Sequence, residues 1–265
     1  MTRDAALPLR AETRSRRYLA PAIPFVVFLG AWQLLTHLAI FPASSFPSPL
    51  KVLSGLMHLA TDQGLLGALG VTVYRVLLGG AIGLTIGLAF GALVAVSRRI
   101  AYAVEPVTSF FQSIGEVGWL PVLVLWLGFN ERPIIAVIAY TVMFPVFFGT
   151  VAGISGLPKN LVDSVRTLGA GRLRLITEVM LPGALPAIIT GFRTGMGFGW
   201  RTVILAELLV GGEGLGVLLF EGREFFRPDW IIAEMLVIGC AWMLLDARVL
   251  VPIERNTVER WGLVR

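Results

Sequence analysis

Several ionisable residues lie inside long apolar runs of this chain. Glu116 lies in one run, and Arg201 and Glu207 lie six residues apart in another. An ionised side chain in the hydrocarbon of a bilayer costs about 2.5 to 3.5 kcal/mol on insertion scales, so such a residue normally faces a partner or a water-filled cavity. These residues therefore predict a polar route through a membrane, or ion pairs that hold helices together.

The two interpretations place Arg201 differently. In the first, Arg201 lines the route of a small anion; in the second, it forms a structural ion pair with Glu116. Six residues separate Arg201 from Glu207, and a helix turns about 100° per residue, so these two side chains project from different faces of their helix. Glu207 is a structural candidate as well as a pathway candidate. The full set of candidate pathway residues is Gln112, Glu116, Trp119, Arg201 and Glu207, with Ser113 beside the first of them.

Other chemistry has no matching pattern. The lysines are Lys51 and Lys159, and neither belongs to a phosphate-binding loop, so the chain has no motif that could cradle ATP. His37 and His58 lack further ligands at metal spacing, so no metal site is predicted. The single cysteine, Cys240, excludes an internal disulfide. No paired nucleophile and base and no nucleic-acid motif occur, so we expect neither an enzyme nor a nucleic-acid binder.

The composition is that of a membrane protein. The 265 residues are 56% hydrophobic and 15% charged, with a mean hydropathy of +0.80. About 20 predominantly apolar residues cross a bilayer as a helix. Six runs meet this requirement, which predicts an all-α membrane protein with six transmembrane helices. The runs are Tyr18–Phe41, Leu66–Val96, Val104–Phe129, Ile134–Ile154, Ile188–Val210 and Trp230–Val251.

The distribution of basic residues predicts the orientation of the six spans. Of the 22 Lys and Arg residues, 15 are assigned to one side of the membrane and four (Lys51, Arg132, Arg223 and Arg227) to the other, and Arg75, Arg193 and Arg201 lie in or at the edges of spans. Lys and Arg concentrate on the cytoplasmic side of membrane proteins, so both termini are predicted to be cytoplasmic. The chain then divides into an N-terminal tail (1–17), one six-span membrane domain (18–251) and a C-terminal tail (252–265).

Glycine and proline suggest how the spans pack. Gly83, Gly87 and Gly91 recur every four residues, which places a smooth stripe on one helix face and favours close approach of a neighbouring helix. A hinge or gate built on these glycines is the functional alternative. Pro121 and Pro145 would each free a backbone carbonyl inside the third and fourth spans.

A polar segment, Asp163–Gly169, separates the fourth and fifth spans on the predicted cytoplasmic side. Asn160 is predicted to cap a short helix that Gly169 and Gly171 end and that presents Val165, Arg166 and Leu168. A second amphipathic piece, 172–180, should stop at Pro182. The segment has no evident use in lipid contact and is predicted to dock a soluble partner. A solvated loop is the alternative.

At this segment the chain resembles the inner-membrane permeases of ABC-type importers, in particular the nitrate, sulfonate and taurine group. Their cytoplasmic signature is Glu-Ala-Ala, three residues, Gly, nine residues, an aliphatic residue, one residue and Leu-Pro. Its positions are occupied here by Asp163, Ser164, Val165, Gly169, Val179, Leu181 and Pro182, with Arg166, Leu168 and Ala170 in a further matching stretch. The resemblance extends to residues 119–129, 181–186 and 199–208.

The resemblance implies a type I ABC importer permease fold in which residues 158–182 form a coupling segment seated in a cytoplasmic ATPase. ATP and Mg²⁺ are then bound by that partner. It also implies a second permease copy of the same sequence, an extracytoplasmic substrate-binding protein and a place in the bacterial inner membrane. Gly211–Gly216 is a candidate contact for the binding protein, with a flexible turn as the alternative.

The implied cargo is a small anionic nutrient such as nitrate, a sulfonate or taurine. The same pattern is similar to permeases for bicarbonate, riboflavin or a thiamine precursor. A secondary carrier driven by an ion gradient, with Glu116 and Glu207 as proton sites, is a rival from another class; six spans without evident inverted repeats favour the importer.

Overall fold

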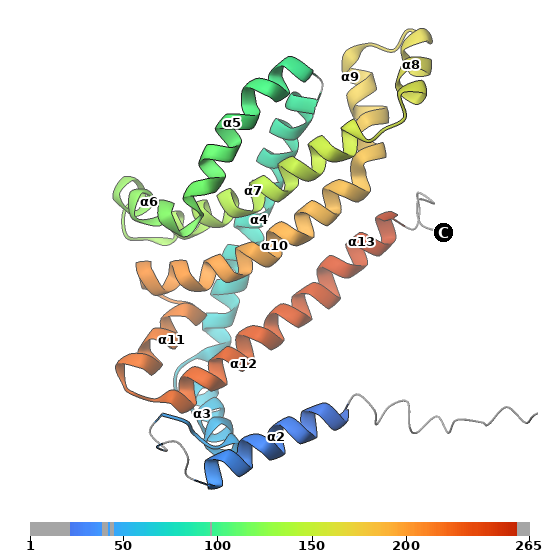
Figure 1. Cartoon of the computed structure of the whole chain (residues 1–265). Coiled ribbons are helices and arrows are strands. Elements are labelled where there is room, and N and C mark those ends of the chain that lie inside the picture. The colour runs from blue at the N-terminus through green and yellow to red at the C-terminus, as the bar shows by residue number, and fades with distance from the viewer. Residues whose placement is uncertain (1–21, 39–41, 43–44, 96, 259–265) are drawn as a thin grey trace, which may run out of the picture.

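The structure is a computed structural model that describes residues 22–38, 42, 45–95 and 97–258. All regular elements in these ranges are helical, which confirms the all-α prediction (Figure 1). The elements in chain order are α2 (Ala22–His37), α3 (Pro49–Thr61), α4 (Leu65–Ala95), α5 (Arg98–Ile114), a 3₁₀ turn (Val117–Trp119), α6 (Leu120–Leu127), α7 (Glu131–Ser155), α8 (Lys159–Thr167), α9 (Arg172–Arg174), a π-helix (Leu175–Met180), α10 (Leu181–Val210), α11 (Leu215–Glu224), α12 (Pro228–Leu245), a second π-helix (Asp246–Leu250) and α13 (Val251–Val258).

Four continuous helical stretches in the described part of the chain are long and apolar enough to cross a membrane. They are Leu65–Ala95, Glu131–Ser155, Leu175–Val210 and Pro228–Thr257. They correspond to the second, fourth, fifth and sixth predicted spans. The fifth begins well before the predicted Ile188, and the sixth continues into the segment assigned to the C-terminal tail.

The third predicted span is not a straight helix. Its two parts, Arg99–Ile114 and Val117–Leu127, meet at an angle of 79°. Gly115 lies at the break with a φ of 72°, in the left-handed region that glycine adopts without a steric penalty. Pro121 falls in the first turn of α6, where its missing N–H removes no helical hydrogen bond. The span predicted over 104–129 is thus a bent pair of helices, and the bend lies at Gly115 rather than at Pro121.

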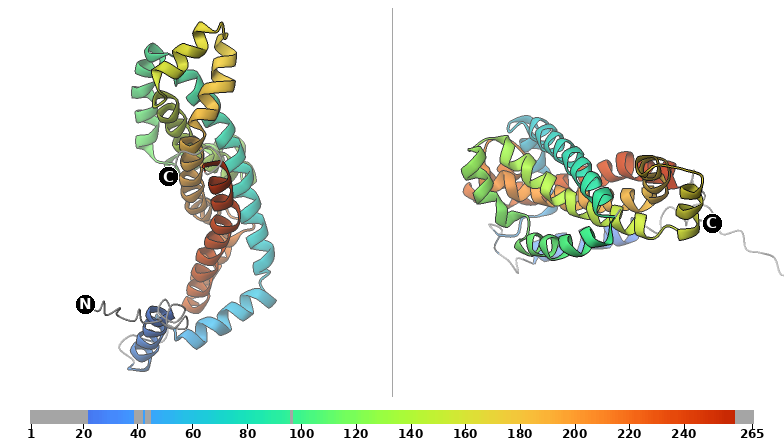
Figure 2. Two further views of the ribbon diagram at one scale, coloured as in Figure 1. Left: turned by 90° about the vertical axis from the view of Figure 1, so that its right-hand side faces the viewer. Right: turned by 90° about the horizontal axis from the view of Figure 1, so that it is seen from above.

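The first predicted span is represented by α2, whose bounds are Ala22–His37. Its apolar helical stretch Val26–His37 is shorter than a full crossing, and the predicted ends at Tyr18 and Phe41 lie outside the described residues. The next helix, α3, was not predicted. Ser48 caps it by accepting a hydrogen bond from the Lys51 amide, and Pro49 occupies the first turn. Figure 2 shows α2 and α3 together at one end of the molecule.

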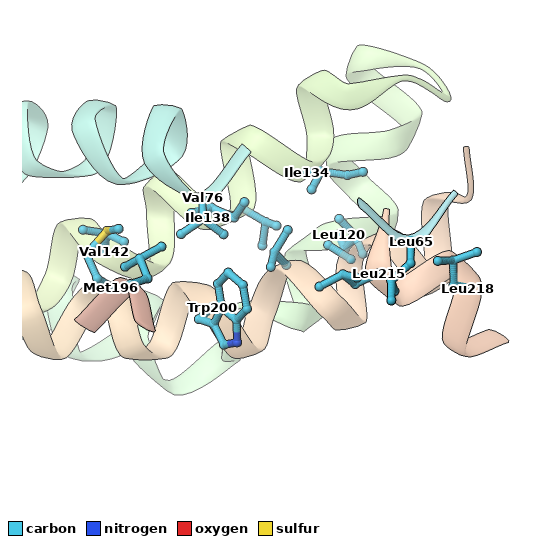
Figure 3. Packing of buried hydrophobic residues seen from close by; sticks show 14 of the residues in the cluster. Leu65, Val76, Leu120, Ile134, Ile138, Val142, Met196, Trp200, Leu215 and Leu218 are labelled. Carbon is cyan, nitrogen blue, oxygen red and sulfur yellow. The ribbon is translucent and has the colours of Figure 1, made fainter. Parts of the chain in front are cut away.

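The core of the molecule forms where α7 packs between α4 and α10. Val76 of α4, Ile138 and Val142 of α7, and Met196 of α10 meet side by side with at most 1% exposure (Figure 3). The glycine stripe of the sequence predicts this close contact between α4 and a neighbouring helix. A Cβ atom at Gly83 would lie 2.5 Å from the Ala139 carbonyl oxygen, because the α4 and α7 backbones pass that closely. Gly87 and Gly91 meet α7 in the same way, which confirms the packing interpretation of the stripe.

The glycine stripe makes a prediction for stability. Replacing Gly83 with Val should separate α4 from α7 and lower the free energy of unfolding by more than about 3 kcal/mol, since overpacking against backbone atoms cannot relax by side-chain movement. Gly70→Val is the matched control on the same helix, because nothing lies within 4 Å of the position of its Cβ. The thermal unfolding of both variants in detergent measures the difference. Equal destabilisation would contradict a packing role for the stripe.

Candidate functional site

The predicted docking segment forms a helical hairpin that projects from one end of the molecule, where α8 and α9 lie (Figure 1). Helix α8 begins after Pro158, and no side chain caps it, so the prediction that Asn160 is the cap is wrong. Pro158 sets the entry of the chain because its own φ is fixed near the observed −58°. Gly169 ends the helix with a φ of 84°, and the Ala170 amide donates to the Val165 carbonyl at 3.3 Å, as the sequence predicts for a glycine end.

Helix α8 has an inner and an outer face. Val162 and Val165 pack against a small core that includes Leu175, Met180 and Ala184, so Val165 is not presented at the surface as predicted. The bulk of valine at this position fills the contact with that core. The outer face carries exposed Asp163, Ser164, Arg166 and Leu168, with Leu168 86% exposed, and half-buried Ala170 follows.

Pro182 does not end the second amphipathic piece. The helix widens into the π-helix Leu175–Met180 and continues into α10, with half-buried Leu181 and Pro182 in the first α-helical turn. In an α-helix, proline lacks a backbone N–H to donate, and its ring clashes with the preceding turn. The π-helical turn just before it changes the hydrogen-bond spacing at this point, so the chain passes the proline without breaking. The last part of the docking segment, from Leu175 onward, and the fifth span are therefore one continuous helix.

Two of the candidate pathway residues line a small cavity between α5, α7 and α10. Gln112 and Glu116 share this cavity of about 160 Å³ with Tyr140 and Phe198. The Thr202 hydroxyl lies 3.5 Å from Glu116 Oε1. Trp119 lies beside this cavity, with its ring stacked on Phe111 at a centroid distance of 5.7 Å. Tyr140, which donates to the Phe111 carbonyl at 2.6 Å, was missed by the sequence analysis.

Arg201 lines a second cavity, of about 440 Å³, between α10 and the helix formed by α12 and α13. Its guanidinium donates to the Gly197 carbonyl at 3.3 Å and lies 5.2 Å from the Phe198 ring centroid. Within the described ranges no carboxylate is paired with Arg201, so the alternative of an Arg201–Glu116 ion pair is not realised in the single chain. Phe198 borders both cavities.

Glu207 lies apart from these cavities in a buried polar network. Its carboxylate is 0% exposed and lies 2.8 Å from the Arg75 guanidinium, and it accepts hydrogen bonds from the Thr72 hydroxyl and, at 3.0 Å, from the Gly216 amide. Arg75 also donates to the backbone carbonyl of Glu213 at 2.6 Å. The network ties α4 and α10 to the start of α11. Arg75 and Glu207 are 132 residues apart, so nothing in the sequence pairs them.

The glycine-rich loop before α11 is held by the same network. Gly214 and Gly216 are buried, and a Cβ at Gly214 would overlap the Glu207 carboxylate. The second half of the segment 211–216 is therefore packed against Glu207. Gly212 and Glu213 remain exposed. The sequence analysis also missed α11, because the glycines before it masked the apolar run that follows.

A third polar cluster was not predicted. Arg193 of α10 donates to both oxygens of Asp246 at 2.8 Å and to Glu254 Oε2 at 2.6 Å. Asp246 begins the π-helix Asp246–Leu250, and Glu254 lies on α13. The three residues border the cavity that contains Arg201. The acidic partners lie 53 and 61 residues from Arg193, beyond the reach of any local pattern.

Comparison with known proteins gives a consistent family. Residues 83–250 match the family described as binding-protein-dependent transport system inner membrane component. A putative aliphatic sulfonates transport permease protein of Bacillus subtilis (strain 168) is 29% identical over 223 residues, covering 84% of this chain and 81% of its own. A taurine transport system permease protein of Escherichia coli (strain K12) is 29% identical over 225 residues, covering 83% and 82%. A nitrate import permease protein of Leptolyngbya laminosa is 27% identical over 270 residues, covering 94% and 95%.

A solved structure supports the fold. A chain of the methionine ABC transporter MetNI in an inward-facing conformation superimposes with a TM-score of 0.63 at 18% identity. The match covers 75% of this chain and 98% of the other. The helices described above thus have the fold of that transporter chain.

Proposed function

Since this chain belongs to the family of binding-protein-dependent transport system inner membrane components, we propose that it carries a small, anionic nutrient inward through a path lined by α5 and α10. The chain is the permease subunit of an ABC importer, a multi-pass protein of the bacterial inner membrane, and it performs no bond chemistry. Relatives that transport sulfonates, taurine and nitrate support an oxyanion as the cargo.

The proposed topology has six spans and cytoplasmic termini. It takes α2, together with residues on either side of it, as the first span, and the bent pair α5–α6 as the third. The 15 basic residues assigned to the cytoplasmic side support this orientation. The proposed limits of the membrane domain stay at 18 and 251, between the two tails.

Residues 158–182 are the proposed coupling segment, which seats in a cleft of the ATPase subunit. The observation that carries this proposal is the outer face of α8, where a nearly fully exposed Leu168 stands beside charged Asp163 and Arg166. An exposed apolar side chain flanked by opposite charges suits a protein partner better than lipid. The ATPase binds ATP and Mg²⁺, because this chain has no phosphate loop.

The proposed path requires a second copy of the chain. Helix α5 is strongly amphipathic and exposes Glu105, Ser109 and Gln112, and α10 exposes Thr194 and Arg201. Polar side chains on spanning helices are stable only against a partner or water. In a homodimer with these faces turned toward each other, the second copy is the partner, and water between the two copies solvates the remaining polar side chains. The exposed Gly212 and Glu213 are proposed contacts for the extracytoplasmic binding protein.

Transport energetics and one substitution test the proposal together. Uptake into proteoliposomes that contain the permease, its ATPase and its binding protein should stop on removal of ATP and persist when the proton gradient is collapsed. Arg201→Gln should lower the rate of oxyanion uptake about tenfold or more, because a charge-assisted contact of roughly 1.5 to 3 kcal/mol is lost.

Arg223→Gln is the control for Arg201→Gln, since Arg223 is exposed on α11, away from both cavities. Its uptake rate should equal that of the wild type. Loss of uptake on collapse of the proton gradient would favour a secondary carrier instead. An unchanged uptake rate for Arg201→Gln would remove Arg201 from the path.

A further inference from the structure

Glu234 of α12 is a buried acidic residue that the proposed function does not use. It is 0% exposed, and neither Oε1 nor Oε2 has a hydrogen-bond partner in the part of the chain that the structure describes. The indole Nε1 of Trp230, one turn earlier on the same helix, is also buried without a partner there. Most buried polar atoms in proteins are hydrogen-bonded, so a carboxyl group left in this way requires an explanation.

The charged groups that act on Glu234 are also acids. They are Glu221 of α11 and Glu207 of α10. The Arg75 guanidinium balances Glu207 at 2.8 Å, whereas Glu221 has no ion-pair partner among the described residues. An ionised Glu234 would therefore lie in the interior beside a like charge, with neither a hydrogen bond nor a counter-charge.

The basic groups on the elements packed against α12 are paired with other acids or exposed. Arg227 forms a bidentate ion pair with Asp229, with distances of 2.8 and 3.0 Å, and Lys51 of α3 acts on the same carboxylate. The other titratable groups on these elements are His58, which pairs with Asp62, the exposed Arg223 and Glu224 of α11, and Asp246, which pairs with Arg193, beside the exposed Arg248 on the second π-helix. Within the described ranges, no basic group is thus placed to neutralise Glu234.

Helix α11 packs closely against the turn of α12 that precedes Glu234. A Cβ atom at Gly222 would lie 3.1 Å from Cγ1 of Ile231. Glu221, the residue before this glycine, is half-buried and borders a cavity of about 350 Å³ together with Gln63 and Glu213. Because Glu221 both acts on Glu234 and borders this cavity, it can pass a proton between the interior and the water outside.

We propose that Glu234 is a proton-binding site that makes the packing of α11 against α12 depend on pH. The carboxyl group holds its proton while the two helices are in contact, because the neutral form avoids the cost of a buried and unpaired charge. When the pH rises, the O–H bond of Glu234 breaks and the proton passes by way of Glu221 to water in the cavity. The carboxylate that remains is stable only when water reaches it, so α11 separates from α12.

This inference goes beyond the proposed function, because it does not depend on the cargo. It has a consequence for transport through the loop 211–216, which leads directly into α11. If that loop contacts the binding protein as proposed, ionisation of Glu234 displaces the contact. Import should then fall at alkaline pH.

Infrared spectroscopy of the purified permease tests whether Glu234 holds a proton. An exposed glutamate releases its proton at about pH 4.3, so the measurement is made at about pH 6. The wild type should show a C=O stretching band of a protonated carboxyl group that Glu234→Gln lacks. Glu224→Gln, at an exposed acid of α11, is the control and should retain the band. Identical carboxyl bands in the wild type and in Glu234→Gln would overturn the proposal.

The pH dependence of unfolding tests the energetic coupling. The folded wild type keeps the proton of Glu234, whereas the unfolded chain has released it above about pH 4.3, so rising pH favours unfolding. Between about pH 5 and pH 7, the folded-to-unfolded ratio of the wild type should fall about tenfold per pH unit relative to Glu234→Met. Methionine has a similar volume and carries no ionisable group, so this variant should fold even if Glu234→Gln does not. The same pH dependence in the wild type and in Glu234→Met would contradict a buried proton.

Hydrogen exchange of the backbone amides in 215–224 locates the movement. Above the pH at which the infrared band disappears, these amides should exchange about tenfold or more faster in the wild type than in Glu234→Met at the same pH. At about pH 5 the two rates should agree. Equal rates at both pH values would overturn the coupling of α11 to Glu234. These measurements use neither cargo nor ATPase, so their failure leaves the proposed function standing, and a failure of ATP-driven uptake leaves the proton site standing.

Discussion

Replacing Leu168 with Asp should abolish ATP-driven uptake while leaving the membrane domain folded. Leu168 is 86% exposed at the end of α8, and its neighbours on the outer face are exposed as well. In the proposed complex this side chain is buried in the ATPase, where an unpaired carboxylate and a lost apolar contact cost roughly 2 to 4 kcal/mol, or about 30-fold to 1000-fold in affinity. Co-purification of the ATPase with the tagged permease and ATP-dependent uptake measure the effect.

A second apolar side chain provides the control for Leu168→Asp. Leu66 is 75% exposed at the first turn of α4, and Asp is favourable there because of the helix dipole. Leu66→Asp should retain the ATPase and the uptake rate. Thermal unfolding of both variants should match the wild type within about 1 kcal/mol. Retention of the ATPase by Leu168→Asp would show that the hairpin is not the coupling element.

Replacing Glu207 with Ala should cause the largest loss of stability of any single carboxylate in the described chain. The substitution leaves Arg75, which is 6% exposed, as an unpaired charge in the interior. Breaking one side of a buried ion pair costs about 3 to 5 kcal/mol. It also removes the acceptor of the Thr72 hydroxyl and the Gly216 amide. Thermal unfolding in detergent and the yield of membrane-inserted protein should both fall.

Glu213→Ala is the matched control for Glu207→Ala. Glu213 belongs to the same network, but it accepts the hydrogen bond of Arg75 through its backbone carbonyl, which alanine preserves. Its stability should stay within about 0.5 kcal/mol of the wild type. The double variant Arg75→Met with Glu207→Met should recover much of the loss, because an apolar pair of similar volume leaves no buried charge. Equal effects of Glu207→Ala and Glu213→Ala would mean that the ion pair contributes little.

Hydropathy and small-residue spacing predict the central helices well, because both depend on physics that acts within one helix. The apolar runs give α7 and α12 close to their observed positions. The spacing of Gly83, Gly87 and Gly91 predicts the close packing of α4, since only a residue without a side chain tolerates a backbone 2.5 Å from its Cβ position. The end of α8 at Gly169 is predicted by the same kind of local chemistry.

The errors have physical causes of two kinds. In the first, a hydropathy average hides a local break: Gly115 bends the third span although the 104–129 window as a whole is apolar enough to count as one run. The prediction at Pro182 is wrong in the opposite way. The proline was expected to end a helix, but the helix continues through it because a π-helical turn accommodates the proline. In the second kind, the determining contact joins distant segments. Neither the Arg75–Glu207 pair nor the cluster at Arg193 leaves a local pattern, so the division of the candidate site into two cavities and a buried network requires coordinates.

The continuity of the helix from Leu175 to Val210 has a mechanical consequence. This stretch of 36 residues begins beside the hairpin, carries Arg201 and reaches Glu207, next to the loop before α11. At 1.5 Å per residue this helix is about 54 Å long, so a tilt of about 5° about one end displaces the other end by about 5 Å. In the proposed complex, closure of the ATPase at the hairpin would therefore move the loop before α11, at the opposite end of this helix.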